Sequence, residues 1–284
     1  MHRFTSDELA AIRDLIGLPE RLTHQARTGT SQVPIDEIRR ALDLPDLPHR
    51  NLLQPDCWIA GGAVSRWLSR DPQNADYDFF FPSVETFNRR ARWLMATHGC
   101  TFRAYRTFWT ICQLCGRPGE LIDQVPAGGD FSLPLSRIRC SRCGEFGGTD
   151  AATLEPERLL RITPQLITAS GMRALELTAP DGAVFQLSPV RIRPTPLEMV
   201  AGFDFSIIQF AVDDKNLYYM PHAWTDLVTG RLRFTTDCRS PFFRLRKYMK
   251  RGFRPYAETV VRIMTAQVQQ LWTLARNPRS WRVR

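Results

Sequence analysis

The sequence predicts an α+β fold, in which helices at both ends flank a core of mixed sheet that carries an insert. Short apolar runs typical of buried strands alternate with helical patterns through the middle of the chain. Helical periodicity dominates near both ends. A segment rich in Gly, Pro and Ser, about 110–148, interrupts the strand region. We therefore expect an N-terminal helical segment over 1–56, a core over 57–235 and a basic C-terminal helical segment over 236–284.

Each element has a local reason. Thr5 and Glu8 have capping-box spacing before a helix over 6–17, and prolines end a second helix at 35–43. Pro180-Asp181-Gly182 is a hairpin signal between two strands. The other expected strands are 57–60, 77–81, 101–109, 172–178, 183–188, 203–212 and 231–235, and the other expected helices are 63–70, 83–98, 195–201, 221–228, 241–251 and 256–276.

Composition excludes several classes of protein. Apolar residues make up 43% and charged residues 24% of the 284 residues, as in ordinary globular proteins, which excludes disorder throughout. No apolar run approaches the roughly 20 residues of a membrane span. The first residues lack the basic-then-apolar form of a signal peptide. These features predict a soluble, cytoplasmic protein without a membrane partner.

The net charge of +9 is concentrated near the C-terminus. Residues 231–284 contain 14 Lys and Arg against Asp237 and Glu258, a net of +12. A basic segment on a nearly neutral body indicates a polyanionic partner, either a nucleic acid such as RNA or nucleotide phosphates. The alternative is a basic helix that is only solvated.

Four of the seven cysteines form two Cys-x-x-Cys pairs, and glycine follows each pair. Two such pairs are typical of structural zinc, because the short turn lets both thiolates face one ion. Disulfides are disfavoured in an intracellular chain, and a redox site needs only one pair. We therefore predict a zinc ribbon inserted in the core, with Zn²⁺ held by Cys112, Cys115, Cys140 and Cys143.

A glycine turn and three acids suggest phosphate chemistry. Gly61-Gly62 joins a strand to a helix, where glycine lets the backbone approach a phosphate. Asp76 and Asp78 are two residues apart, so in a strand both point to one face, and their oxygens suit Mg²⁺. Asp204 interrupts an apolar run, where a buried carboxylate is costly unless it faces a cation. The alternatives are an acidic turn at 71–76 and a solvated strand end at Asp204.

A late helix supplies a basic face. Arg244, Lys247 and Arg251 lie three and four residues apart, so they share one side of a helix. Such a face fits a triphosphate or a nucleic-acid backbone.

Together, these motifs resemble the DNA polymerase β-like nucleotidyltransferase superfamily. Gly-Gly, then Asp-x-Asp, then a later acid is that superfamily's order. The head domain of CCA-adding and poly(A) polymerases is similar at Gly61-Gly62-Ala63-Val64, at Phe203-Asp204-Phe205-Ser206-Ile207 and at the proline-led helix 241–253. The resemblance covers about 57–100 and 172–253. Ser65-Arg66 stands where that family has Arg-Asp, and 126 residues separate Asp78 from Asp204.

The resemblance implies a site with two divalent metal ions, Mg²⁺ or Mn²⁺. It assigns Asp76, Asp78 and Asp204 as the catalytic and metal-binding acids. Asp204 ranks first as the third acid, with Asp123 and Glu176 as alternatives. A nucleoside triphosphate such as ATP would bind the residues Gly61, Gly62, Arg66, Arg244, Lys247 and Arg251.

The function that this resemblance implies is transfer of a nucleoside monophosphate from a nucleoside triphosphate to an acceptor hydroxyl. The zinc pairs and the basic segment favour RNA as the acceptor. The alternative is a non-catalytic nucleic-acid-binding protein, in which a zinc ribbon and a basic helix grip the backbone.

Overall fold

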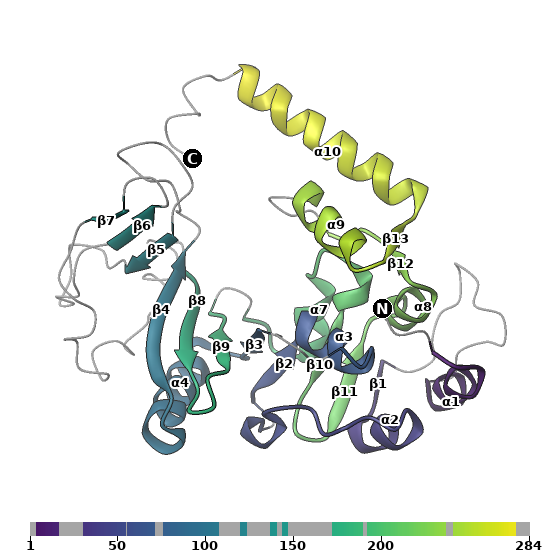
Figure 1. Cartoon of the computed structure of the whole chain (residues 1–284), viewed down its shortest axis with the longest axis horizontal. Helices are drawn as coiled ribbons and strands as arrows, with labels where there is room; N and C mark the ends of the chain where they lie inside the picture. Colours follow the sequence, from purple (N-terminus) through teal and green to yellow (C-terminus); the bar gives the residue numbers. More distant parts are fainter. Residues whose placement is uncertain are drawn as a thin grey trace. The chain divides into compact units, whose positions relative to one another are not determined.

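The computed structural model describes residues 4–16, 31–54, 56–71, 76–107, 120–123, 137–140, 144–146, 172–189, 192–236 and 241–276. The chain forms two compact units (Figure 1). The first unit is built from Met1–Ala75 and Thr195–Val283, and the second unit from Asp76–Pro194. None of the helices among the described residues is both long and apolar enough to cross a membrane.

The first unit contains four consecutive antiparallel strands. Their order is β1 (Gln32–Pro34), β11 (Asn216–Tyr219), β10 (Phe210–Val212) and β2 (Trp58–Ala60). Every residue of β2 and β10 is buried. Trp224 packs edge-on against aromatic rings of β10 and β11. These strands therefore form the centre of the first unit.

Helices surround these strands. α1 begins as expected, because the backbone amide of Glu8 donates to the Thr5 hydroxyl (3.2 Å) and the Thr5 amide donates to the Glu8 carboxylate (2.6 Å). A parallel pair of short strands, β12 (Arg231–Leu232) and β13 (Arg254–Pro255), connects the last helices to the body. The helices of this unit are α1 (Ser6–Ile16), α2 (Ile35–Ala41), α3 (Gly62–Leu68), α7 (Pro196–Ala201), α8 (Ala223–Thr229), α9 (Pro241–Lys250) and α10 (Ala257–Arg276).

The expected strand over 203–212 is wrong for most of its length. Only Phe210–Val212 is a strand, and Ser206–Ile208 is a short 3₁₀ helix. The segment is buried, and an isolated antiparallel bridge between Phe205 and Phe234 pairs its backbone with another segment, while side chains bind the carbonyl of Phe203. The Gln209 amide donates to the carbonyl of Phe203 (3.2 Å), and the Thr235 hydroxyl donates to the same oxygen. The strands β1 and β11 were not expected from the sequence.

The second unit contains a mixed four-stranded arrangement. Its order is β3 (Tyr77–Phe80), β9 (Val184–Leu187), β8 (Met172–Thr178) and β4 (Thr101–Thr107). β3 and β9 are parallel, and the other neighbours are antiparallel. The expected hairpin turn is confirmed by Gly182, which has φ +85°, and by the amide of Ala183, which donates to Asp181 (3.0 Å).

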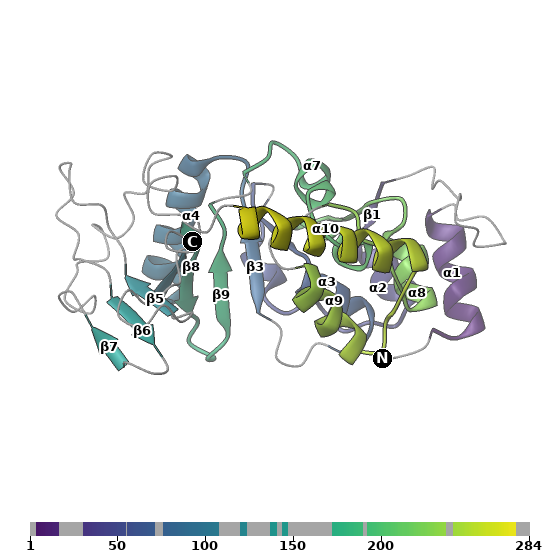
Figure 2. The same cartoon turned by 90° about the horizontal axis from the view of Figure 1, so that it is seen from above.

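One long helix accompanies this sheet. α4 (Val84–His98) begins at Ser83, whose hydroxyl accepts from the Thr86 amide, and ends at Gly99 in the left-handed conformation. It lies beside β8 in both views (Figures 1 and 2). Phe87 on this helix packs edge-on against Phe81. The α+β class with a mixed sheet is thereby confirmed.

The inserted segment contains a separate small sheet. Its antiparallel strands are β5 (Glu120–Asp123), β6 (Arg137–Cys140) and β7 (Gly144–Phe146). Cys140 ends β6 and is in register with Gly144, which opens β7. The second cysteine pair therefore spans the β6–β7 connection.

Candidate functional site

The glycine turn lies at the end of β2. Gly61 has φ +78° and ψ −132°, a backbone conformation that side chains with a Cβ rarely adopt, so glycine is required. Its amide donates to the carbonyl of Phe210 (2.9 Å), which fixes the turn against β10. A Cβ at Gly62 would meet nothing within 4 Å, so the chain leaves open space beside the turn.

The same unit brings the segment of Asp204 to this turn. A Cβ on Gly61 would lie 3.5 Å from the ring of Phe203, the residue before Asp204. The Thr235 amide donates to the carbonyl of Asp204 (2.9 Å), which holds its backbone. The Asp204 residue is only 3% exposed, and its carboxylate forms an ion pair with the guanidinium of Arg244 from α9. The cation that compensates this buried acid is therefore a residue of the chain itself.

Asp76 and Asp78 lie in the second unit. Asp76 is exposed and immediately precedes β3, and Asp78 is half-buried within that strand. Asp78 is in register with Gln186 on β9, which in turn is in register with Glu176 on β8. Residues directly opposite in neighbouring strands point to the same face, so these three side chains form one row. We call them the acid row.

The acid row has a buried end at Glu176 and a half-buried end at Asp78. Glu176 is 1% exposed, and it accepts a hydrogen bond from the Gln186 amide (3.0 Å). Arg103 lies 3.8 Å from its other oxygen. Neighbouring strands are about 4.8 Å apart, so the Cα atoms of Asp78 and Glu176 are about 10 Å apart with Gln186 between them. Mg²⁺ is commonly held by one or two carboxylates and several waters, so Asp78, with Asp76 just before the same strand, has the chemistry that would suit that ion.

The described residues contain no group of three or more His, Cys, Asp or Glu side chains close enough to hold a metal ion. Cys112, Cys115 and Cys143 lie outside the described residues. The side chains of Cys140 and Asp123 lie outside them as well.

The residues of the expected basic face of α9 lie in different surroundings. Arg244 points to Asp204, whereas Lys247 is exposed. Tyr248, buried beside Arg244, has its pKa raised by burial. Burial, and then the nearby charge of Arg66, lowers the pKa of Arg251. Arg66 and Arg251 are therefore brought near each other, and Arg244 and Lys247 are given different surroundings.

Arg251 also lines an open pocket of about 330 Å³ in the first unit. Asp71 is near enough to favour its charged form. The pocket therefore offers both cationic donors and one carboxylate acceptor. Its lining residues are Ser69, Asp71, Lys250, Arg251, Gly252 and Phe253.

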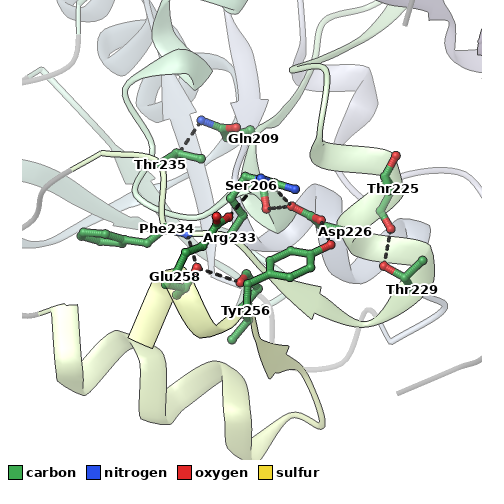
Figure 3. Close-up of polar contacts among 12 residues, drawn as sticks. Ser206, Gln209, Thr225, Asp226, Thr229, Arg233, Phe234, Thr235, Tyr256 and Glu258 are labelled. Atoms are coloured by element: carbon green, nitrogen blue, oxygen red, sulfur yellow. Dashed lines mark hydrogen bonds and ion pairs between the residues drawn. The ribbon is translucent and has the colours of Figure 1, made fainter. Parts of the chain in front are cut away.

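A further buried network of the first unit was not expected from the sequence (Figure 3). Asp226 on α8 is fully buried and accepts from the Ser206 hydroxyl (2.6 Å), Arg233 Nε (3.1 Å) and the Tyr256 hydroxyl (2.8 Å). Arg233 also reaches the exposed Glu258 (3.3 Å). Burial, and then the charge of Asp226, raises the pKa of Tyr256 to about 12. The network ties α8 to the segment that carries Asp204 and to the start of α10.

Solved structures with similar folds include CCA-adding enzymes. A complex of a CCA-adding enzyme with CTP is 14% identical, with a TM-score of 0.47, and the match covers 84% of this chain and 46% of that one. The Thermotoga maritima CCA-adding enzyme complexed with tRNA is 15% identical, with a TM-score of 0.41 and coverages of 76% and 38%. This chain thus spans less than half the length of either structure.

No curated protein matches the sequence. The family model described as "Gad2: Gabija anti-defense 2 family protein" matches residues 36–230. That range includes the glycine turn, the acid row and Asp204. The chain therefore belongs to the Gabija anti-defense 2 family.

Proposed function

We propose that this chain is a metal-dependent nucleotidyltransferase, which moves a nucleoside monophosphate from a nucleoside triphosphate to an acceptor hydroxyl. The observation that carries the proposal is the acid row of the second unit, in which Asp78, Gln186 and Glu176 share one face of the sheet. Asp76 directly precedes β3, the strand that carries Asp78. Oxygen ligands on one face suit a divalent ion that binds phosphate oxygens.

Each residue has a stated task in this proposal. Asp76 and Asp78 hold Mg²⁺ or Mn²⁺. The bound ion would supply positive charge to phosphate oxygens and lower the pKa of the acceptor hydroxyl. Glu176 adds negative charge on the same face, and its hydrogen bond from Gln186 fixes its orientation. Both Asp204 and Glu176 are buried beside an arginine, but Arg244 contacts Asp204 directly, whereas Arg103 lies 3.8 Å from Glu176. Glu176 also shares the sheet face of Asp78, which supports it as the third acid and supports a structural task for Asp204.

The first unit supplies residues for the triphosphate. The turn at Gly61 and Gly62 exposes backbone beside open space, which suits close approach of a phosphate. Arg66 and Arg251 are near each other, and two like charges are favoured together when an anion lies between them. Arg244 and Lys247 remain candidates for the same task, Arg244 after release from Asp204.

We propose RNA as the acceptor. The net charge of +12 in residues 231–284 supports it, since phosphate contacts dominate binding to nucleic acids. Membership of an anti-defense family supports a purpose for the reaction: the transfer would act against the Gabija defence. A protein of that defence is then the acceptor that a negative result with RNA would favour.

A zinc ion is part of the proposal. Cys140 and Gly144 are paired across the β6–β7 connection, which supports a turn at the second cysteine pair. Cys112, Cys115, Cys140 and Cys143 would supply four thiolates, as in structural zinc sites. Metal analysis of the purified protein should find one zinc per chain, and Cys140→Ser should lose it. Equal zinc content in both proteins would contradict this assignment.

A second candidate function is non-catalytic binding of nucleic acid. The outward face of α9 favours it, because it carries two exposed aromatic rings among cations: Phe242, Phe243, Arg246, Lys247 and Lys250. Aromatic stacking and phosphate contacts are how proteins bind single strands without reading sequence. This function predicts steeply salt-dependent RNA binding that needs no nucleoside triphosphate.

One assay separates the two functions. Purified protein is incubated with each α-³²P-labelled nucleoside triphosphate, Mg²⁺ or Mn²⁺, and total small RNA. We expect label in RNA from the wild type, and at least about a hundredfold less from the double variant Asp76→Ala/Asp78→Ala. Asp14→Asn, which alters an exposed acid on α1, is the matched control and should label normally. Label that is unaffected by the double variant would overturn the proposal.

A further inference from the structure

Helix α10 exposes an uncharged apolar stripe that consists of Val261, Met264 and Val268. In the described part of the chain, every exposed large apolar side chain lies on α9 or α10. On α10 they include Val261 at 64%, Met264 at 51% and Val268 at 60% exposure. Exposed apolar patches that are confined to one place mark interaction sites.

The stripe lies opposite the face by which α10 is anchored. Thr259 and Ile263 are buried, and the Thr259 hydroxyl donates to the carbonyl of Leu232 (3.1 Å). Arg262 reaches the carbonyl of Phe234 (3.2 Å). Residues three and four apart share a helix side, so Val261, Met264 and Val268 form the opposite side. The body of the first unit therefore holds α10 and leaves this stripe uncovered.

The spacing of the stripe is that of a coiled coil. Val261, Met264 and Val268 follow one another by three and four residues, and Leu271 and Ala275 continue the same heptad positions. Valine occupies the first core position at 261 and 268, Ala275 stands at the next one, and Met264 and Leu271 occupy the second core position. In parallel coiled coils, β-branched residues at the first position with Leu at the second favour two strands over three or four.

The absence of charge along the stripe indicates which kind of partner fits it. Residues 263–275 contain no Asp, Glu, Lys, Arg or His, although the segment 231–284 carries a net +12. A nucleic acid or an acidic protein surface would call for cations along the stripe. The segment 263–275 of a second copy is equally uncharged, so two copies can meet along the stripe without like charges at the seam.

The size of the contact is sufficient for association. α10 has 20 residues, so at about 1.5 Å per residue it is about 30 Å long. Two helices that meet along this length bury on the order of 1,000 Å², near the lower limit for a specific interface. The association would thus depend on protein concentration.

We propose that the protein forms a twofold-symmetric dimer in which the α10 helices of two copies pair in parallel through Val261, Met264 and Val268. Each copy presents the same surface to the other, as a closed twofold interface requires. The inference rests on α10 alone and holds whether or not the chain is a nucleotidyltransferase.

Sedimentation equilibrium of the full chain over a wide range of concentration tests the dimer. We expect the wild type to dimerise, and Met264→Lys to weaken self-association more than about a hundredfold, because it places two ammonium groups in one apolar seam. Gln269→Lys adds the same charge to an exposed position beside the stripe and should dimerise like the wild type. A wild type that stays monomeric at every concentration, or a Met264→Lys variant that dimerises unchanged, would overturn the proposal.

Cysteine crosslinking decides the orientation and does not depend on how the lysine variant folds. In a parallel pair, Val268 lies opposite its own counterpart in the other copy. On mild oxidation, Val268→Cys should form a covalent dimer that the wild type, with its own seven cysteines, does not form. Gln269→Cys is the matched control and should remain uncrosslinked. Equal crosslinking of both variants, or of neither, would count against the parallel stripe.

Discussion

The two units use acidic side chains in opposite ways. In the first unit, Asp204 and Asp226 are buried, and each is compensated by an arginine of the same unit. In the second unit, Asp76 is exposed and Asp78 is half-buried, whereas Glu176 on the same sheet face is buried beside an arginine, Arg103. A buried acid with an arginine in direct contact fixes the chain, whereas the exposed Asp76 and the half-buried Asp78 are accessible to a cation. The sequence alone presents Asp76, Asp78 and Asp204 together as candidates for chemistry, ranks Glu176 behind Asp204 and does not single out Asp226.

The largest effect on stability is expected at Asp226. Asp226→Asn removes the charge that compensates Arg233 in a buried site, which should lower the free energy of unfolding by about 3–5 kcal/mol. Glu258→Gln is the control, because the same arginine loses only a partner that is 70% exposed. That variant should cost less than about 1 kcal/mol. Urea unfolding measures both, and equal losses would show that burial does not distinguish the two acids.

The glycine turn should be sensitive at one residue and tolerant at the next. Gly61→Ala forces a Cβ into a backbone conformation with φ +78°, which should cost about 1–3 kcal/mol. Gly62→Ala meets no atom within 4 Å and should change the free energy of unfolding by less than about 1 kcal/mol in either direction. Thermal unfolding of the two variants is the measurement. If nucleotide binding fails in a stable Gly62→Ala variant, open backbone at the turn contacts the nucleotide.

The smallest predicted effect on stability at neutral pH is that of Tyr256, and this effect grows as the pH becomes alkaline. Its pKa is raised from 10 to about 12 in the folded protein, so its contribution to stability is complete below pH 10 and is lost as the pH rises toward 12. The free energy of unfolding should therefore fall across that window. Tyr256→Phe removes the ionisable hydroxyl and should flatten this part of the profile. An identical decline in the variant would assign it to other groups, such as Tyr218, whose pKa is also raised to about 12.

Much of the fold could be predicted because its signals are local. α1 and α4 begin at side-chain caps that are visible in the sequence, and the hairpin at Gly182 follows from its turn residues. The segment 203–209 was misread because an apolar run indicates burial without specifying a strand. Its backbone partners are Gln209 and residues 233–235, and Thr235 is more than 30 residues away from Phe203.

The candidate site could be predicted only in part for the same reason. Asp76 and Asp78 are recognisable by their spacing, and Gly61 by its place between a strand and a helix. Glu176 joins the acid row only through the register of β3, β9 and β8, which no spacing along the sequence reveals. The pairing of Asp204 with Arg244 joins residues 40 positions apart, so its compensation was equally hidden.

The most direct test compares the two candidates for the third acid, with Glu176→Gln and Asp204→Asn measured side by side for label transfer and for urea unfolding. We expect Glu176→Gln to lower transfer by at least about tenfold, because it removes negative charge from the acid row. Asp204→Asn should lower stability through the loss of its ion pair with Arg244 and should retain transfer at temperatures where it is folded. The opposite pattern, transfer lost in a folded Asp204→Asn variant and normal in Glu176→Gln, would contradict the division between a catalytic second unit and structurally compensated acids in the first.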